Sequence, residues 1–344
     1  MTKTHSESGF SLIELLISMG VLLTVSSIVT SALLQMTSSQ ATIWNRTEMH
    51  SGIRGATELL QQEVGQAGRI TLPATMTLIN AVIANPAAPC DAGVPATNAL
   101  TGVPVSSTAG LFAMPGVNPS YITLTTMDGD VQESFKVAAF NPSATPPTID
   151  ACFTASHAAG TVLVPMGGFA TGIVPPLSPD PAHLPLPYTG YPNGSTPTKL
   201  KLYGDINGDG NMVYVEYTCD PTTTHNLYRN VVAFDSATKP AVTDREILLS
   251  NIIDNPGGTA CFTYQYATMS VQGTPFTFVI DVAITLTVQT QEVDPVTKQF
   301  QRETKALLNV SPRNVFNSWS LASIGYTDRI QSTPTSVTTL LALP

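Results

Sequence analysis

The chain has 344 residues, which is long enough for one large domain or two modest ones with a substantial buried core. Charged residues make up 11% and hydrophobic residues 43%, and this composition excludes disorder driven by charge. The net charge is −9 and the sequence has no Lys/Arg cluster, so we expect no nucleic-acid partner. The 24 Gly and 27 Pro follow no repeat, which excludes collagen and predicts a loop-rich fold.

The first strong element in chain order is an apolar helix. Residues 1–9 are polar, and residues 10–36 then run for 27 positions with Glu14 as the single charge and without proline. At 1.5 Å per residue, such a helix exceeds the hydrocarbon core of a bilayer, which is about 30 Å thick. We therefore predict a membrane-spanning helix, whose Ser and Thr side chains can hydrogen-bond to helix carbonyl groups.

Two simpler interpretations of this segment fit less well. A secretory signal would have a shorter apolar stretch of about 7–15 residues and a clear cleavage site after it. A plain membrane anchor would leave Glu14 unexplained, because a carboxylate in a spanning helix costs about 2–3 kcal/mol by insertion scales. Glu14 is therefore a candidate functional residue.

Residues 9–14, GFSLIE, resemble the class III leader junction of type IV pilins and type II secretion pseudopilins. The resemblance implies that prepilin peptidase cleaves after Gly9, that Phe10 becomes the N-methylated first residue, and that Glu14 becomes the fifth mature residue. If Glu14 pairs with the Phe10 amine of a neighbouring subunit, two costly charges in an apolar filament core offset each other and fix the axial register. Many major pilins carry Pro near the middle of the span, whereas this chain has Gly20 and a Ser pair at 26–27.

Residues 37–69 predict an amphipathic continuation of the helix outside the membrane. Apolar side chains recur at three- and four-residue steps on one helical face, namely Met49, Ile53, Ala56, Leu60, Val64 and Ala67. We expect this face to pack under a β-sheet. The segment ends in LLQQEVGQAGR, which resembles the acidic-x-x-x-Ala-Gly helix ending of PilW-type minor pilins.

Residues 70–198 predict a loop-rich β region. Residues 70–120 have no sustained period, and Asp128-Gly129 lies between two alternating segments, which is typical of a β-hairpin. Residues 141–198 hold 12 of the 27 prolines, so we expect a long insertion over the surface there.

Residues 199–313 predict an antiparallel sheet, and residues 314–344 a tail that is mostly polar from residue 320 onward. The expected strands are 199–203, 212–218, 227–234, 246–252, 261–266, 276–291 and 300–310, of which the last two form a long hairpin. The segments EILLSNIIDNPGGTACFTYQY, DVAITLTVQTQ and ETKALLNVSPRNV resemble the C-terminal sheet of PilW-type minor pilins, which often end on a similar Arg-Asn segment.

A candidate calcium loop lies between the first two of these strands. Residues 205–216 fit the pattern D-x-[DN]-x-[DN]-G-x5-E, in which alternate oxygen ligands surround a hard cation and a Gly permits the sharp turn. The candidate ligands are Asp205, Asn207, Asp209, the Asn211 carbonyl and Glu216. A solvated Asp/Asn/Gly hairpin turn remains the alternative, because the flanks predict strands and not the helices of an EF-hand.

The cysteines predict disulfides, and no motif predicts catalysis. Cys90, Cys152, Cys219 and Cys261 are widely spaced and even in number, so we expect two disulfides with three connectivities open. The sequence has no HExxH, GxSxG, P-loop or GxGxxG motif, and its five scattered histidines indicate no catalytic set. We therefore expect no enzymatic activity.

We expect an α+β fold in which a long N-terminal helix packs on an antiparallel sheet, as in pilins. Its expected parts are a leader (1–9), a membrane and filament-core helix (10–36), an exported helix (37–69), a loop-rich β region (70–198), a sheet (199–313) and a tail (314–344). The resemblance implies a minor type IV pilin that primes assembly at or near the pilus tip. It also implies prepilin peptidase, other minor and major pilins, an inner-membrane assembly platform and membrane lipid as partners.

The resemblance places the chain in the inner membrane, with its bulk in the periplasm, before assembly and on the pilus at the cell surface afterwards. The alternatives are a J-type pseudopilin of a type II secretion system, a calcium-dependent surface adhesion module on the pilus, and an anchored enzyme. The last of these would not be cleaved after Gly9.

Overall fold

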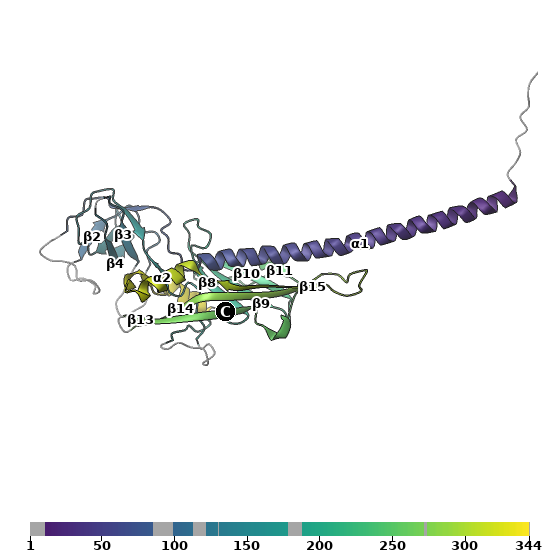
Figure 1. The fold of residues 1–344 in the computed structure, drawn as a ribbon. Coiled ribbons are helices and arrows are strands. Elements are labelled where there is room, and N and C mark those ends of the chain that lie inside the picture. Colours follow the sequence, from purple (N-terminus) through teal and green to yellow (C-terminus); the bar gives the residue numbers. More distant parts are fainter. Residues whose placement is uncertain are drawn as a thin grey trace, which may run out of the picture. The chain divides into compact units, whose positions relative to one another are not determined.

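The computed structural model describes residues 11–84, 99–112, 122–129, 131–177, 188–271 and 274–343. The chain forms two compact units, and α1 (Leu12–Gln66) contributes to both (Figure 1). The first unit comprises the chain up to Gly52 together with Gln289–Glu303, and the second comprises Ile53–Val288 and Thr304–Pro344.

The N-terminal part of α1, residues 12–36, is a continuous apolar helix, and we refer to it as the apolar half. Its mean hydropathy reaches 2.2 over an 18-residue window of which no part is buried, so by length and composition it could cross a membrane. The expected hydrogen bonds from side-chain hydroxyls to helix carbonyls are present, as in Ser18 to Leu15 at 2.9 Å and Thr24 to Val21 at 2.8 Å. They satisfy the polar side chains within the helix and leave its surface apolar.

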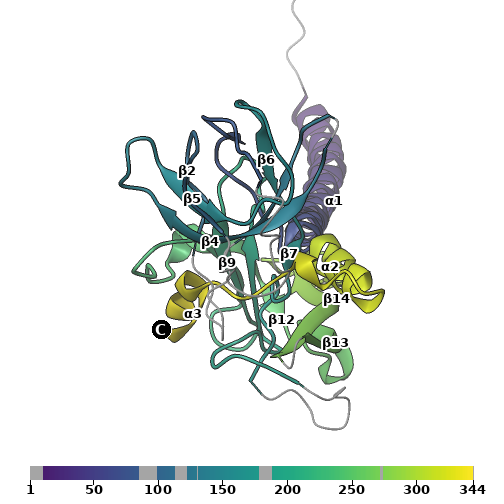
Figure 2. The same ribbon diagram turned by 90° about the vertical axis from the view of Figure 1, so that its left-hand side faces the viewer.

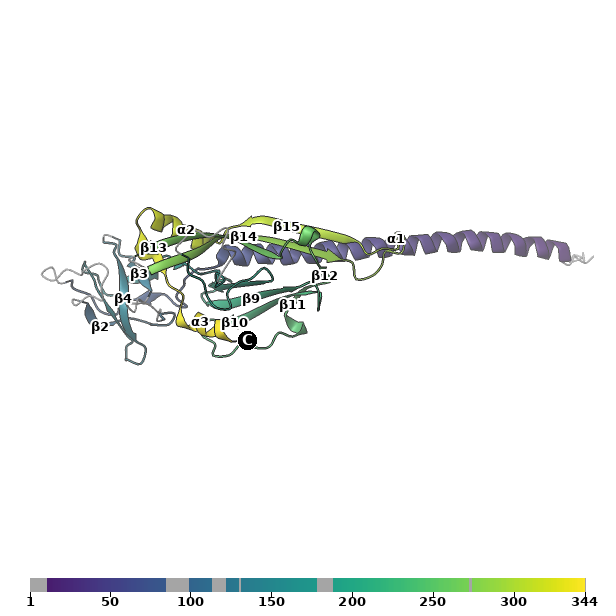
Figure 3. The same cartoon turned by 90° about the horizontal axis from the view of Figure 1, so that it is seen from below.

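The first unit also contains the loop between β14 (Thr274–Gln289) and β15 (Arg302–Val310). The two strands pair with each other, which confirms the predicted long hairpin. The loop reaches along α1 in the direction of its N-terminal half (Figure 3).

The second unit begins with a six-stranded sheet in the order β1-β6-β3-β4-β5-β2. Its strands are β1 (Met76–Thr77), β2 (Leu100–Pro104), β3 (Thr123–Thr126), β4 (Ser134–Asn141), β5 (Thr148–Ala151) and β6 (Val162–Pro165). β3 and β4 pair antiparallel around Asp128-Gly129, which confirms the predicted hairpin. Figure 2 shows β4, β5 and β2 side by side.

Six of the seven strands expected after residue 199 are confirmed, but the strand expected at 246–252 is two short strands in different sheets, and the single expected sheet is two sheets. One sheet has the order β11-β10-β9-β8, and another has the order β12-β14-β13 with β15 on β14. Their bounds are β8 (Lys199–Gly204), β9 (Val213–Asp220), β10 (Asn226–Ala233), β11 (Ile247–Ser250), β12 (Ile252–Ile253) and β13 (Phe262–Val271). The expected α+β class, with one long N-terminal helix and antiparallel sheets, is therefore confirmed.

The apolar face of the second half of α1 is buried as predicted. Ile53, Ala56, Leu60, Val64 and Ala67 are each at most 2% exposed, and Met49 is 9% exposed. At roughly 2 kcal/mol for each fully buried large side chain, this face supplies much of the energy that holds the helix in place.

The prediction of a polar C-terminal tail was wrong. Residues from Arg313 onward form α2 (Arg313–Ser323), the short strand β16 (Ile330–Gln331) and α3 (Thr335–Ala342). Val337, Leu340 and Leu341 of α3 are at most 2% exposed and join the main core with Tyr203 and Tyr214. Their spacing of three and one buries one side of a short helix, and the Ser and Thr residues between them lack that apolar character.

The Pro-rich segment is only partly a surface insertion. β7 (Gly168–Phe169) pairs in parallel with β16, and Phe169, Ile173 and Val174 are fully buried. The prolines at 179, 181, 185 and 187 lie outside the described residues. The Pro-rich composition predicted a surface loop, but this segment also contains residues that are buried in the core.

Candidate functional site

The predicted assembly residues lie at the start of α1. Gly9 and Phe10 are outside the described residues, and Glu14 lies in the first turn of the helix. The Ser11 backbone N–H donates to Glu14 Oε2 at 3.3 Å, and a carboxylate there interacts favourably with the positive end of the helix dipole. The Glu14 side chain is exposed, as are the apolar residues that follow it. Within the part of the chain that the structure describes, this carboxylate therefore lies on an exposed apolar helix surface.

A buried ion pair holds the other end of α1 on the sheet. Glu63 is 2% exposed, and both its carboxylate oxygens accept from Arg229 of β10, with Nε at 3.0 and 3.2 Å. Tyr217 of β9 also donates to Glu63. Burial raises the pKa of Tyr217, and the neighbouring Glu63 raises it further, so the phenol keeps its proton and acts as a donor.

The Ala-Gly helix ending and the Arg-Asn segment meet in the structure. Gly68 has φ +78°, and a Cβ there would lie 2.9 Å from Val315 of α2. Asn314 Nδ2 donates to the carbonyl of Gln66 at 3.2 Å, where helix carbonyls lack an internal partner. The two segments singled out by resemblance therefore form one junction, in which α2 covers the C-terminus of α1.

The structure pairs Cys219 with Cys261, and the disulfide links β9 to the start of β13. Cys152 is also disulfide-bonded. Cys90 lies outside the described residues.

The candidate calcium loop joins β8 to β9, as expected. Asp205, Asn207, Asp209 and Asn211 share this loop, and the Asp209 N–H donates to Asp205 Oδ1 at 3.1 Å. Asp205 is 1% exposed and its Oδ2 accepts no hydrogen bond, but Arg69 Nε lies 3.6 Å from that atom. A guanidinium already supplies positive charge where the predicted ion would be bound. Among the described residues no group of three or more His, Cys, Asp or Glu could hold a metal.

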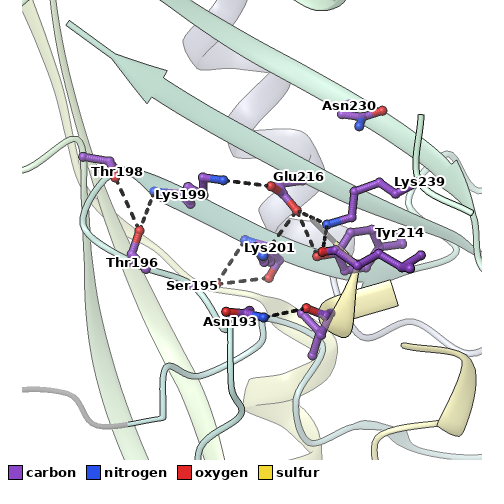
Figure 4. A network of polar contacts seen from close by, with 12 residues as sticks. Asn193, Ser195, Thr196, Thr198, Lys199, Lys201, Tyr214, Glu216, Asn230 and Lys239 are labelled. Atoms are coloured by element: carbon purple, nitrogen blue, oxygen red, sulfur yellow. Dashed lines mark hydrogen bonds and ion pairs between the residues drawn. The ribbon is translucent and has the colours of Figure 1, made fainter. Parts of the chain in front are cut away.

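Glu216 is not brought to that loop. It lies opposite Lys201 in the β8–β9 pairing, inside a polar network (Figure 4). Its carboxylate is 3.5 Å from Lys199 Nζ, 3.4 Å from Lys201 Nζ and 3.2 Å from Lys239 Nζ. Burial works against its charge, but the three ammonium groups hold the pKa of Glu216 below its usual value. Glu216 is therefore not a ligand of the predicted calcium loop, because its position on β9 places its carboxylate beside the three lysines.

Lys239 also joins the network to the C-terminal segment. Its ammonium donates to the Leu343 carbonyl at 3.2 Å, just beyond α3. Positive charge near the end of a helix interacts favourably with the helix dipole. The network thus serves to fix α3, and charge composition alone did not indicate it.

A second buried polar group was missed by sequence reasoning. The side chain of His157 is fully buried, with Nε2 at 2.7 Å from Glu133 and Nδ1 at 3.3 Å from Asp128. Glu133 also accepts from the Thr154 backbone N–H at 2.7 Å. The alternating segments around Asp128-Gly129 predicted the hairpin, but nothing in the sequence brings residue 157 to it. The group ties the hairpin to a distant loop.

Comparison with known proteins identifies the leader. Residues 4–30 match the family described as the prokaryotic N-terminal methylation motif, and this range contains Gly9, Phe10 and Glu14. Neither a curated protein nor a solved structure matches the chain significantly. The match shows a type IV pilin-like, class III prepilin leader, and the long N-terminal helix followed by antiparallel sheets is consistent with a pilin-like fold.

Proposed function

We propose that this protein is a minor type IV pilin, similar in type to PilW, that primes pilus assembly at or near the tip. Prepilin peptidase cleaves it after Gly9, the inner membrane holds its apolar helix, and the assembly platform transfers it to the filament. Its partners there are other minor and major pilins. It acts as a structural subunit and not as an enzyme.

The observation that carries this proposal is the exposed apolar surface of the helix that begins within the methylation motif. The methylation motif at residues 4–30 opens a helix whose apolar half is not buried by any of the residues that the structure describes. Such a surface requires lipid or other apolar helices, and both are available to a pilin at different stages. Glu14, the single charge on that half, then has a neighbour's terminal amine as its natural partner.

Processing is tested by the mass and N-terminal sequence of the protein from native membranes. We expect the mature chain to begin at Phe10 and to carry one methyl group. A chain that begins at any other residue would disprove the proposal.

The role of Glu14 is tested by Glu14→Ala, with Glu48→Ala as the matched control. Glu48 is exposed on the same helix beyond the apolar half. We expect Glu14→Ala to be inserted and cleaved but to be lost from sheared pili, while Glu48→Ala is incorporated normally. Normal incorporation of both variants would contradict the proposed pairing.

Deletion of the gene separates the pilus from the alternative of a type II secretion system. We expect loss of surface pili with normal protein secretion. Loss of secretion with normal pili would instead favour the J-type pseudopilin.

Calcium binding by the loop at Asp205 stays a prediction, now without Glu216. Because Arg69 is 3.6 Å from Asp205, it should compete with a bound cation. In calorimetry we expect Arg69→Gln to bind calcium about tenfold more tightly than the unchanged chain, a difference of about 1.4 kcal/mol. Absence of heat in both proteins would rule out calcium, and with it the calcium-dependent adhesion alternative.

A further inference from the structure

The first unit exposes a second group of apolar side chains, beyond the apolar half of α1. Two lie on the helix and three on the loop between β14 and β15. Their exposed fractions are 65% for Ile43, 74% for Trp44, 44% for Val293, 63% for Val296 and 44% for Phe300. We refer to these five residues as the collar.

The loop that carries three collar residues is closed by its own hydrogen bonds. The Thr290 N–H donates to the Gln301 carbonyl at 2.9 Å, and the Asp294 N–H donates to the Gln299 carbonyl at 3.0 Å. Asp294 is 2% exposed and accepts from the Val296 N–H at 2.7 Å. Although burial opposes it, the hydrogen bonds from the Val296 and Thr297 N–H groups hold the pKa of the Asp294 carboxyl below its usual value. These hydrogen bonds give the loop a defined backbone conformation, which fixes the positions of its three apolar collar residues.

The same loop is attached to one face of α1. Thr42 Oγ1 donates to Asp294 Oδ1 at 3.2 Å, Arg46 donates to Gln301, and His50 pairs with Glu303. Positions 42, 46 and 50 follow the four-residue step of a helical face. Trp44 is two positions, or about 200°, away from Thr42 around the helix. Apolar side chains therefore lie on both sides of the helix at one level.

When the apolar half lies in a bilayer, the part of α1 around Trp44 lies at the bilayer surface. Trp44 is eight residues beyond Met36, or about 12 Å along the helix axis. Helical side chains point back toward the N-terminus, so the indole covers the preceding turn, about 5 Å closer to the apolar residues. The headgroup layer of each leaflet is roughly 5–8 Å thick, and Trp is enriched in it.

We propose that the collar contacts the lipid headgroup layer at the C-terminal end of the membrane span. This rests on the assignment of α1 as a membrane-spanning helix, which itself carries Ile43 and Trp44 of the collar. Lys298, exposed at the tip of the loop, provides an ammonium group for lipid phosphates. The collar would set how deep the subunit lies before it leaves the membrane.

The test measures depth at three positions of the full-length chain in vesicles of phosphatidylethanolamine and phosphatidylglycerol. Spin labels are attached to Val296→Cys in the collar, Leu23→Cys in the apolar half and Val242→Cys in the second unit. Val242 is 44% exposed, which matches two of the collar residues. We expect Leu23→Cys at hydrocarbon depth, Val296→Cys at headgroup depth and Val242→Cys in water.

Trp44 gives a second measurement without a label. In a Trp319→Phe background it is the single tryptophan, because the chain has two. We expect its emission to shift to the blue on insertion, and lipids brominated near the headgroup to quench it more than lipids brominated near the chain end.

Three outcomes would overturn the proposal. If Leu23→Cys is in lipid while Val296→Cys and Trp44 are in water, the collar does not contact the membrane. If Leu23→Cys is also in water, the membrane assignment itself fails. If the collar positions become protected only in assembled pili, their partner is a neighbouring subunit and not lipid.

Discussion

The two halves of α1 differ in where their apolar side chains find a partner. In the N-terminal half Leu, Ile and Val side chains are more than half exposed, for example Leu23 at 68%, whereas Leu60 in the C-terminal half is fully buried. The C-terminal half is therefore covered within the second unit, whereas the described residues leave the apolar side chains of the N-terminal half exposed.

The largest expected effect comes from removing a buried leucine. Leu60→Ala should lower the free energy of unfolding by about 3–4 kcal/mol, because it removes apolar contacts and leaves a cavity. Leu23→Ala, the matched change in the exposed half, should leave it within about 0.5 kcal/mol. Urea denaturation of the full chain in mild detergent measures both, and equal effects would contradict the division of the helix.

The two glutamates of the helix should differ in the same way. Glu63→Ala leaves Arg229 without its partner and should lower the free energy of unfolding by about 3 kcal/mol. Glu14→Ala should not change it, since Glu14 contacts only the Ser11 N–H of its own helix in the described residues. Denaturation separates this effect from assembly, where we expect Glu14 to be the important residue.

A smaller difference is expected between two glycines. Gly68→Ala should destabilise the second unit by about 1–2 kcal/mol, because Gly68 has φ +78° and its new Cβ would contact Val315 at 2.9 Å. Gly20 has no neighbour within 4 Å, so Gly20→Ala should be neutral or slightly favourable to the helix. Thermal unfolding of the two variants checks this, and a stable Gly68→Ala protein would contradict the close junction.

The smallest effect concerns pH and only the second unit. The folded pKa of Glu216 lies below its unfolded value of about 4.3, so its stabilising contribution is present above that pH. It is lost as the pH falls through the folded pKa. Denaturation between pH 6 and about pH 3 should therefore show a loss that Glu216→Gln reduces, whereas the helical signal of the exposed half in detergent should persist. An identical pH profile for both proteins would count against the lysine network.

Much of the fold and part of the candidate site could be predicted from the sequence. The apolar half, the buried face from Met49 to Ala67 and the strands after Lys199 follow from local periodicity, which sets which side chains share a face. The polar tail was mispredicted because α3 is short and rich in Ser and Thr. Glu216 was misassigned because the metal pattern counts positions and ignores the direction of a strand.

The sequence by itself determined the leader, the apolar rod and its single carboxylate, because these depend on neighbouring residues and on length. Only the tertiary structure decided the partners of Glu63, Glu216 and His157, since each partner comes from a strand or loop distant in the chain. The same holds for the junction of Gly68 with α2 and for the attachment of the β14–β15 loop to α1. The local sequence pattern determines which side chains share one face of a helix or strand, whereas tertiary packing determines which residues those side chains contact.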